Sequence, residues 1–237
     1  MSTIHDVFFG LAVNARAVRV ATSLGQRSTI ACEDLSRANE WIELAAYGVP
    51  LPEKHRILAC IALPGNHPRS GRLDVLDAAR AAGWDAVLVV NTLHAAGRGL
   101  RARSSAGEED LPLVVVDAAL SSVGILRGRP LGLLDHDAVH SIAGREAREV
   151  AVSLRILLKQ RPREVARALL RRVVVVGDGN EVERVGRRLY ERELEALGAQ
   201  QVDFDLDPFL IAQGALALAQ ETESQTWRRL RRRWARG

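Results

Sequence analysis

Short apolar runs alternate along this chain with segments whose apolar residues recur at the helical period. The apolar runs predict strands at residues 7–13, 17–21, 57–63, 86–90, 113–116, 124–126, 173–176 and 202–204. The periodic segments predict helices at residues 36–47, 71–82, 138–170 with a break at Pro162, 179–197 and 208–219. Strands that alternate with helices in both halves of a chain indicate an α/β protein.

The order of elements is similar in the two halves. The first half opens with two strands joined by a tight turn at Asn14, and a strand–helix–strand unit follows. About 20 residues separate the strand centres of that unit, which predicts a parallel, right-handed crossover. The polar stretch 98–110 is rich in Gly and Ser and predicts the boundary between the halves.

Composition excludes several classes of protein. The chain has 237 residues, of which 47% are hydrophobic, so it is large enough for a substantial core and too apolar for a disordered protein. No run of 18 uncharged apolar residues occurs, and residues 1–18 lack the layout of a secretion signal, so we expect no membrane-spanning segment. Cys32 and Cys60 lack the spacing of a metal or redox pair, which predicts a reducing, cytoplasmic location.

The basic charge is concentrated at the C-terminus. The chain has 33 Lys and Arg against 29 Asp and Glu, and six of the arginines lie in the last ten residues. The remainder, with 27 basic and 29 acidic residues, is close to neutral. The pI near 9.6 therefore reflects one short segment.

Residues 63–100, 173–186 and 207–219 form three segments with a shared family pattern. They resemble, in this order, segments of the actin-like ATPase superfamily, and of DnaK-type chaperones within it. LPGNHPRSGRLDVLDAARAAGWDAVLVVNTLHAAGRGL (63–100) is similar to the chaperone segment that runs from a strand ending in Pro to an Asn-starting turn. VVVVGDGNEVERVG (173–186) resembles the adenosine-side glycine loop, and DPFLIAQGALALA (207–219) resembles the closing helix. The matches follow the family's order and cover roughly residues 7–219.

This resemblance implies the actin-like ATPase fold, with two ribonuclease-H-like lobes. Residues 1–105 would form the first lobe, residues 106–222 the second, and residues 223–237 a basic amphipathic tail. The closing helix, 208–219, would return to the first lobe. Only residues 144–172 fill the interval where the chaperones carry a large nucleotide-covering subdomain, so we expect a minimised relative without peptide chaperoning.

The first phosphate loop and the connecting turn depart from the family pattern. The family carries carboxylates that hold Mg²⁺ and position the attacking water. The matching stretch of the first loop, Gly10 to Asn14, has none, and Thr92 stands where the connecting turn has a Glu. These losses predict that the chain does not hydrolyse ATP efficiently.

Other parts of the nucleotide pattern are retained. Asp117 matches the acidic start of the second phosphate loop, although Ala118 and Ala119 replace its glycines. Gly177 and Gly179 leave room for a ligand to approach the backbone closely. A Gly-Asp-Gly turn between a strand and a helix is, however, also common in α/β proteins that bind no ligand there. If nucleotide binding is retained, ATP or ADP with Mg²⁺ is expected to contact Asn14, Asp117, Gly177 and Gly179.

The C-terminal tail predicts an amphipathic helix. On a helix Trp227, Leu230 and Trp234 share one face, and arginines fill the rest. The segment resembles the membrane-targeting helix of FtsA-type bacterial actin homologues, and Trp prefers the membrane interface. The predicted membrane-binding residues are Trp227, Arg228, Arg229, Leu230, Arg231, Arg232, Arg233 and Trp234. Binding to nucleic acid and docking on an acidic partner are the alternatives.

Two other groups of residues resemble functional sites only weakly. Asp135-His136-Asp137 with His140 places two imidazoles four residues apart, which would suit zinc on a helix. Asp137 as the N-cap of a helix that begins near Ala138 is the simpler interpretation, so no metal site is predicted. Ser121 and Ser122 lack the context of a nucleophile, and no catalytic residue is predicted.

The leading hypothesis is a cytoplasmic, catalytically degenerate actin-like protein, a pseudo-ATPase. It would act as a scaffold or adaptor at the inner face of a bacterial cell membrane, recruited by its tail. One alternative is a nucleotide-binding switch with ATP in the interlobe cleft, and another is a nucleic-acid-binding protein. The sequence identifies no protein partner, and a homo-oligomer is compatible with it.

Overall fold

The structure, a computed structural model, describes residues 4–234 except 15, 33, 35–36, 66, 104–112, 119–121, 127–135, 142–146 and 178. The chain forms two compact units: Met1–Gly99 with Ile211–Gly237 (unit 1) and Leu100–Leu210 (unit 2). It therefore crosses between units twice, near residues 99 and 210. The predicted lobe boundary at residues 105 and 106 lies outside the described residues.

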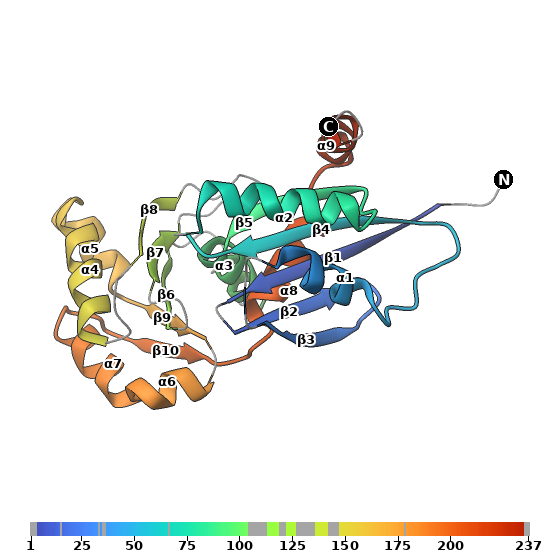
Figure 1. The fold of residues 1–237 in the computed structure, drawn as a ribbon. Helices are drawn as coiled ribbons and strands as arrows, with labels where there is room; N and C mark the ends of the chain where they lie inside the picture. Colours follow the sequence, from blue (N-terminus) through green and yellow to red (C-terminus); the bar gives the residue numbers. More distant parts are fainter. Residues whose placement is uncertain are drawn as a thin grey trace. The chain divides into compact units, whose positions relative to one another are not determined.

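Unit 1 contains a mixed five-stranded sheet with the order β3-β2-β1-β4-β5 (Figure 1). Its strands are β1 (His5–Val13), β2 (Ala17–Thr22), β3 (Arg27–Ala31), β4 (His55–Leu63) and β5 (Ala86–Asn91). β1 is antiparallel to β2 and parallel to β4, and β4 is parallel to β5. The predicted first hairpin and the parallel crossover are thus confirmed, whereas β3 was not predicted.

Helices cover both faces of this sheet. They are α1 (Ala38–Ala46), α2 (Arg69–Ala81), α3 (Thr92–Arg103), α8 (Leu210–Glu221) and α9 (Ser224–Trp234). Alternate β4 residues pack on α1 and α2, as Ala59 does, or on α3 and α8, as Cys60 does. The expectation that residues 98–110 form an irregular boundary is wrong up to Arg103, because α3 continues through this stretch.

Two glycines allow α8 to pack unusually close to its neighbours. A Cβ at Gly10 of β1 would lie 2.2 Å from both the Ala212 carbonyl oxygen and the Leu216 nitrogen of α8. A Cβ at Gly214 of α8 would lie 1.8 Å from the Ala95 carbonyl oxygen of α3. These distances are impossible for a real side chain, so glycine is required at both positions. The backbone of α8 therefore touches those of β1 and α3.

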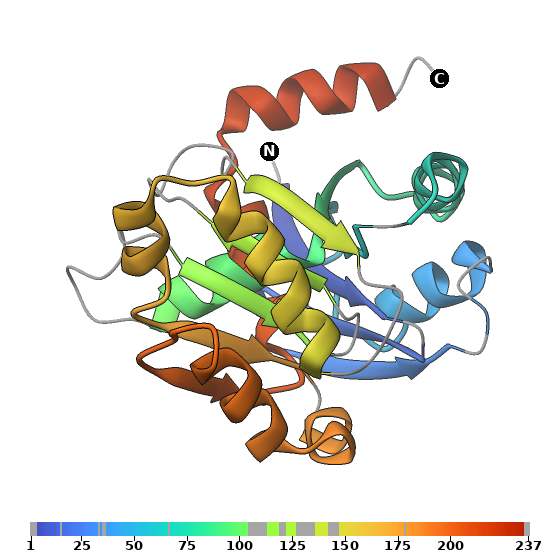
Figure 2. The same ribbon diagram turned by 90° about the vertical axis from the view of Figure 1, so that its left-hand side faces the viewer.

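The C-terminal helix α9 packs beside β5, the edge strand of the unit 1 sheet (Figures 1 and 2). Trp227 joins the cluster between the sheet and α3 and α8, and its Nε1 donates to the Ala219 carbonyl oxygen at 3.1 Å. Trp234 packs against the cluster on the opposite face, and its Nε1 donates to the Trp84 carbonyl oxygen at 2.7 Å. α9 thus straddles the edge of the sheet, with one indole on each face.

Unit 2 repeats the strand topology of unit 1. Its strands are β6 (Leu113–Asp117), β7 (Ser122–Leu126), β8 (His136–Ser141), β9 (Val173–Val176) and β10 (Val202–Asp205), in the order β10-β9-β6-β7-β8. β7 is antiparallel to both β6 and β8, whereas β6, β9 and β10 are parallel to one another, as in unit 1. The helices are α4 (Ala147–Lys159), α5 (Arg163–Leu169), α6 (Gly179–Val185) and α7 (Arg187–Glu195). In the described part of the chain, only α4 and α5 lie between β8 and β9.

Two predictions for unit 2 are wrong. Asp137 was interpreted as the N-cap of a helix from Ala138, but residues 136–141 form β8 and pair with β7. The helix predicted over 179–197 is interrupted at Gly186, which has a φ of 97° and separates α6 from α7.

The close approach of α8 predicts the effect of two glycine substitutions on stability. Gly214→Ala is expected to lower the free energy of unfolding by about 1–3 kcal/mol, because the new Cβ overlaps the Ala95 carbonyl oxygen. Gly179→Ala is the matched control: it also lies in a helix, and its Cβ would meet nothing within 4 Å. Urea denaturation followed by tryptophan fluorescence measures both. Equal loss of stability in the two variants would contradict the tight α8 contact.

Candidate functional site

The turn between β1 and β2, which matches the first phosphate loop, is closed by its own side chain. The Asn14 Oδ1 accepts hydrogen bonds from the backbone N–H groups of Arg16 (2.9 Å) and Ala17 (2.8 Å). The Asn14 N–H donates to the Ala17 carbonyl oxygen at 3.0 Å. A phosphate cradle requires N–H groups aimed at the anion, and here the chain uses them itself. Gly10 makes room for α8, so its missing side chain serves packing.

The connecting turn is the first turn of α3. The Asn91 Oδ1 accepts a hydrogen bond from the Leu93 N–H at 2.8 Å, which caps the helix. Thr92, at the position of the family's Glu, is only 1% exposed, and its Oγ1 has no hydrogen-bond partner among the described residues. The turn therefore holds a buried, unsatisfied hydroxyl in place of a carboxylate.

The carboxyl ends of the parallel strands in unit 2 bring three of the four predicted nucleotide residues together. Asp117 of β6 pairs in register with Val176 of β9, and the Ala118 N–H donates to the Val176 carbonyl oxygen at 2.9 Å. Gly177 follows Val176 directly, and Gly179 begins α6 with open space where a Cβ would lie. Ligands of α/β sheets bind at such strand ends. The Asp117 side chain is fully buried, and Asn14 belongs to unit 1.

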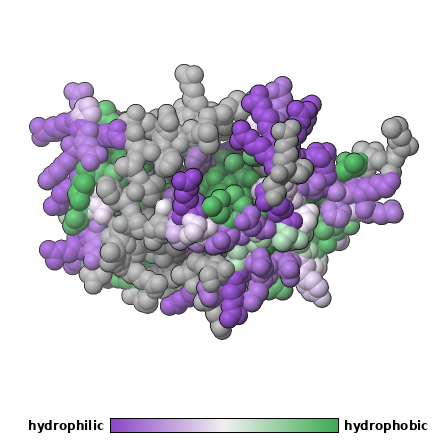
Figure 3. All heavy atoms as spheres, turned by 45° about the horizontal axis from the view of Figure 1, so that its top comes forward, coloured by the Kyte–Doolittle hydropathy of each residue, from purple (hydrophilic) through white to green (hydrophobic). Residues whose placement is uncertain are grey.

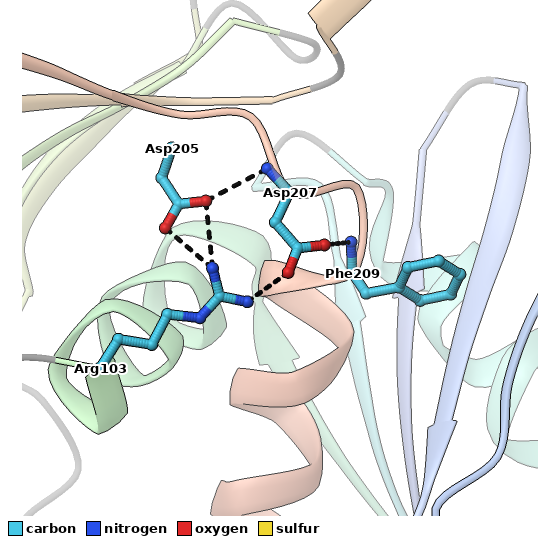
Figure 4. Close-up of polar contacts among 4 residues, drawn as sticks. All are labelled: Arg103, Asp205, Asp207 and Phe209. Atoms are coloured by element: carbon cyan, nitrogen blue, oxygen red, sulfur yellow. Dashed lines mark hydrogen bonds and ion pairs between the residues drawn. The ribbon is translucent and has the colours of Figure 1, made fainter.

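Arg103, the last residue of α3, belongs to unit 2 and holds two carboxylates of the same unit, as Figure 4 shows. The Arg103 Nη1 lies 3.2 and 3.0 Å from the two carboxylate oxygens of Asp205, and its Nη2 donates to Asp207. Asp205 also accepts a hydrogen bond from the Asp207 N–H at 3.1 Å, and Asp207 accepts one from the Phe209 N–H at 2.8 Å. The Asp-Pro pair that resembles the family's closing motif thus caps α8 and neutralises Arg103.

The predicted membrane-binding face of the tail is used inside unit 1. Trp227 is 4% exposed, and Leu230 and Trp234 are half-buried. The guanidinium carbon of Arg80 lies 5.0 Å from the centre of the Trp234 ring, a cation–π arrangement. Inserting these indoles into a bilayer would first require α9 to leave the body. None of the helices in the described ranges is long and apolar enough to span a membrane.

The arginines of α9 form its outer surface. Arg228, Arg229, Arg232 and Arg233 are exposed, and Arg231 is half-buried. Figure 3 brings the top of the view in Figure 1 forward, and hydrophilic side chains predominate among the described residues at its upper right. The predicted tail residues therefore separate into docked apolar side chains and outward-facing cations.

Cysteine and metal chemistry find no support in the described residues. Burial raises the pKa of the Cys60 thiol far above its usual value, and burial also raises the pKa of Cys32, so both thiols stay protonated at neutral pH. His136 and His140 lie in β8, and four residues of a strand span about 13 Å of backbone. Elsewhere in the described ranges no group of three metal-binding side chains occurs.

Comparisons with known proteins identify the fold. No protein-family model matches the chain, and no curated protein matches it in sequence. Among solved structures, MamK in a double helical filament aligns with a TM-score of 0.70 and 15% identity over 92% of this chain and 100% of that one. MreB5 of Spiroplasma citri bound to ADP has a TM-score of 0.63 and 9% identity, with 98% and 99% covered.

A third similar structure is the ethanolamine utilization protein EutJ from Carboxydothermus hydrogenoformans. Its TM-score is 0.57 at 14% identity, with 90% of this chain and 89% of that one covered. The chain therefore has the actin-like ATPase fold, as its sequence resemblance implied. The narrower resemblances to DnaK-type chaperones and FtsA-type proteins stay predictions.

The closed first turn predicts how two substitutions of Asn14 differ. Asn14→Ala is expected to lower the free energy of unfolding by about 1–2 kcal/mol, because two backbone N–H groups lose their acceptor. Asn14→Asp keeps an acceptor oxygen in the same place and is expected to cost less than half as much. Urea denaturation of the two variants beside the parent chain tests this. A larger loss for Asp than for Ala would show that the turn is not closed in this way.

Proposed function

We propose that this chain is an actin-like protein that does not hydrolyse ATP and acts as a scaffold or adaptor, held at an anionic membrane surface by the arginines of α9. The observation that carries the first part is the Asn14 turn. Its N–H groups bond to the Asn14 side chain, and the described residues of the turn include no carboxylate. Phosphoryl transfer depends on positioned phosphates and on charge neutralisation by Mg²⁺ and cationic groups. The residues present on this side do not fit a bound triphosphate.

The scaffold role is supported by the fold and by what one similar structure does. MamK was solved as a double helical filament, so a protein of this fold assembles into filaments while it keeps the fold. An actin-like chain that cannot hydrolyse nucleotide retains two compact units and their surfaces for contact with copies or partners. The partner is a protein or a further copy of this chain.

The membrane role is supported by the exposed arginines with α9 in its docked position. Each Arg near an anionic surface contributes about 1 kcal/mol, without any insertion of the indoles. Because Trp227 and Trp234 both donate hydrogen bonds to the body, we propose electrostatic attachment of the intact unit. The same docking leaves no free indole in α9 for stacking on bases, which disfavours the nucleic-acid alternative.

A nucleotide-binding switch is the second candidate, and the strand ends of unit 2 favour it. Asp117 and Gly177 lie on neighbouring strands, and the open space at Gly179 fits a close approach by an adenosine group. MreB5 was solved with ADP and a MamK mutant with AMPPNP, so proteins of this fold hold nucleotides. In this chain such a ligand would bind without being cleaved.

Nucleotide assays separate these two functions. We expect no release of phosphate from ATP with Mg²⁺ above the rate in buffer, because the first turn holds neither the phosphates nor the metal. Calorimetry with ATP and with ADP is then expected to show no binding at micromolar ligand. Heat that disappears in Asp117→Ala would favour the switch, and phosphate release that disappears in the same variant would overturn the proposal.

Vesicle binding tests the attachment. The full chain is expected to sediment with phosphatidylglycerol vesicles at low salt and to be released as salt is added. Arg229→Gln with Arg233→Gln is expected to weaken binding by about fivefold per arginine, at about 1 kcal/mol each. Trp234→Phe removes the hydrogen bond to the body and part of the ring that packs there, but no charge, so it is expected to leave vesicle binding unchanged. Loss with Trp234→Phe and none with the arginine pair would instead support insertion of the indole face.

A further inference from the structure

A basic cavity lies between the end of α2, the start of β5 and α9. Its volume is about 590 Å³. Its lining residues are Arg80, Gly83, Trp84, Asp85, Arg228, Arg231, Arg232 and Trp234. All of them belong to unit 1, and α9 supplies half of them.

The charge of this cavity is strongly one-sided. Four of its lining residues are arginines and one is an acid, and an oxygen of that acid, Asp85, already accepts the Ile57 N–H at 2.9 Å. Arg80 has an ion pair, at 3.2 Å to Asp77. Arg228, Arg231 and Arg232 have no ion-pair partner among the residues that the structure describes. The cavity therefore concentrates positive charge that the chain itself does not balance.

Contacts within unit 1 hold Trp234 and Arg80 in place. Trp234 is fixed by its hydrogen bond to the Trp84 carbonyl oxygen, and Arg80 stacks on its ring at 5.0 Å. The Arg80 Nε is buried and lacks a hydrogen-bond partner in the described part of the chain. Arg228, Arg231 and Arg232 are three and four residues apart, which puts them on one face of α9. The guanidinium fork is planar, so an arginine loses little freedom for each hydrogen bond that it forms to an anion.

We propose that this cavity binds a ligand with two linked or neighbouring phosphate groups. Guanidinium forks match phosphate oxygens in pairs, and several arginines together require more than one negative charge. The carboxyl end of α2 by itself repels an anion, and Arg80 in its last turn offsets that effect. The indole of Trp234 provides a wall on which the stem of such a ligand packs.

The two-phosphate ligand has two possible sources. One is a soluble diphosphate, and the other is the head group of cardiolipin, a lipid with two phosphates. The lipid source rests on the proposed membrane attachment, whereas the soluble source does not. The cavity lies beside the exposed arginines of α9, so a lipid held there would add to the general attraction of the surface.

The experiment compares two double variants that change the charge equally. Arg231→Gln with Arg232→Gln removes two cations from the cavity, and Arg229→Gln with Arg233→Gln removes two from the same helix outside it. Binding of pyrophosphate is measured by calorimetry on the full chain. Binding to vesicles is measured with cardiolipin, or with twice as much phosphatidylglycerol, so that the surface charge is equal.

The cavity variant is expected to lose pyrophosphate affinity by about tenfold or more, and the control variant by less than about threefold. With phosphatidylglycerol the two variants should weaken equally, because each loses two cations from the same helix. With cardiolipin the cavity variant is expected to lose about tenfold more affinity than the control variant. Pyrophosphate binding without vesicle binding would support the cavity for a soluble ligand and overturn the membrane proposal. Equal losses in both variants with every probe would overturn the cavity and leave attachment by surface charge. Absence of binding to all probes would overturn both.

Discussion

The packing of α8 directly against the backbones of β1 and α3 is the constraint on which the rest of unit 1 depends. Gly10 and Gly214 permit it, because any side chain at either position would overlap main-chain atoms. Only two residues separate α8 from α9. The position of α8 therefore restricts α9 to the neighbouring edge of the sheet. The docked indoles, the outward arginines and the basic cavity all follow from that placement.

Much of the fold could be predicted because its central strands are continuous apolar runs. β4 and β9 are buried on both faces, so their sequences contain almost no polar residue that would blur the pattern. The missed elements lack this signal. β3 is an exposed edge strand, and α3 contains two glycines that lower its helix propensity. One of them, Gly99, lies beside Gly214 of α8. For α3, tertiary contact outweighs local preference.

The features of the candidate site that depend on residue type could be predicted from the sequence. The contacts between residues that are distant in the sequence could not. The missing carboxylate at Asn14 is visible in the sequence, but the hydrogen bonds that close the turn are not. Arg103 binds Asp205 and Asp207, which lie about a hundred residues away in the sequence, so no local spacing predicts these contacts. The Trp and Leu residues of the tail form an apolar face, and such a face has the same sequence pattern whether it packs on protein or binds lipid. The pattern therefore does not show that this face packs beside β5.

Without α9, the edge strand β5 of unit 1 would lose the helix that packs beside it. β5 pairs with β4 on one side, and among the strands that the structure describes it is the last of the sheet on the other. An uncovered edge strand is a template for pairing with another chain. Removing α9 by truncation or proteolysis would therefore open unit 1 to strand addition, and a chain shortened to eliminate its basic charge would be prone to aggregate. The tail is a cover for the sheet as well as a carrier of charge.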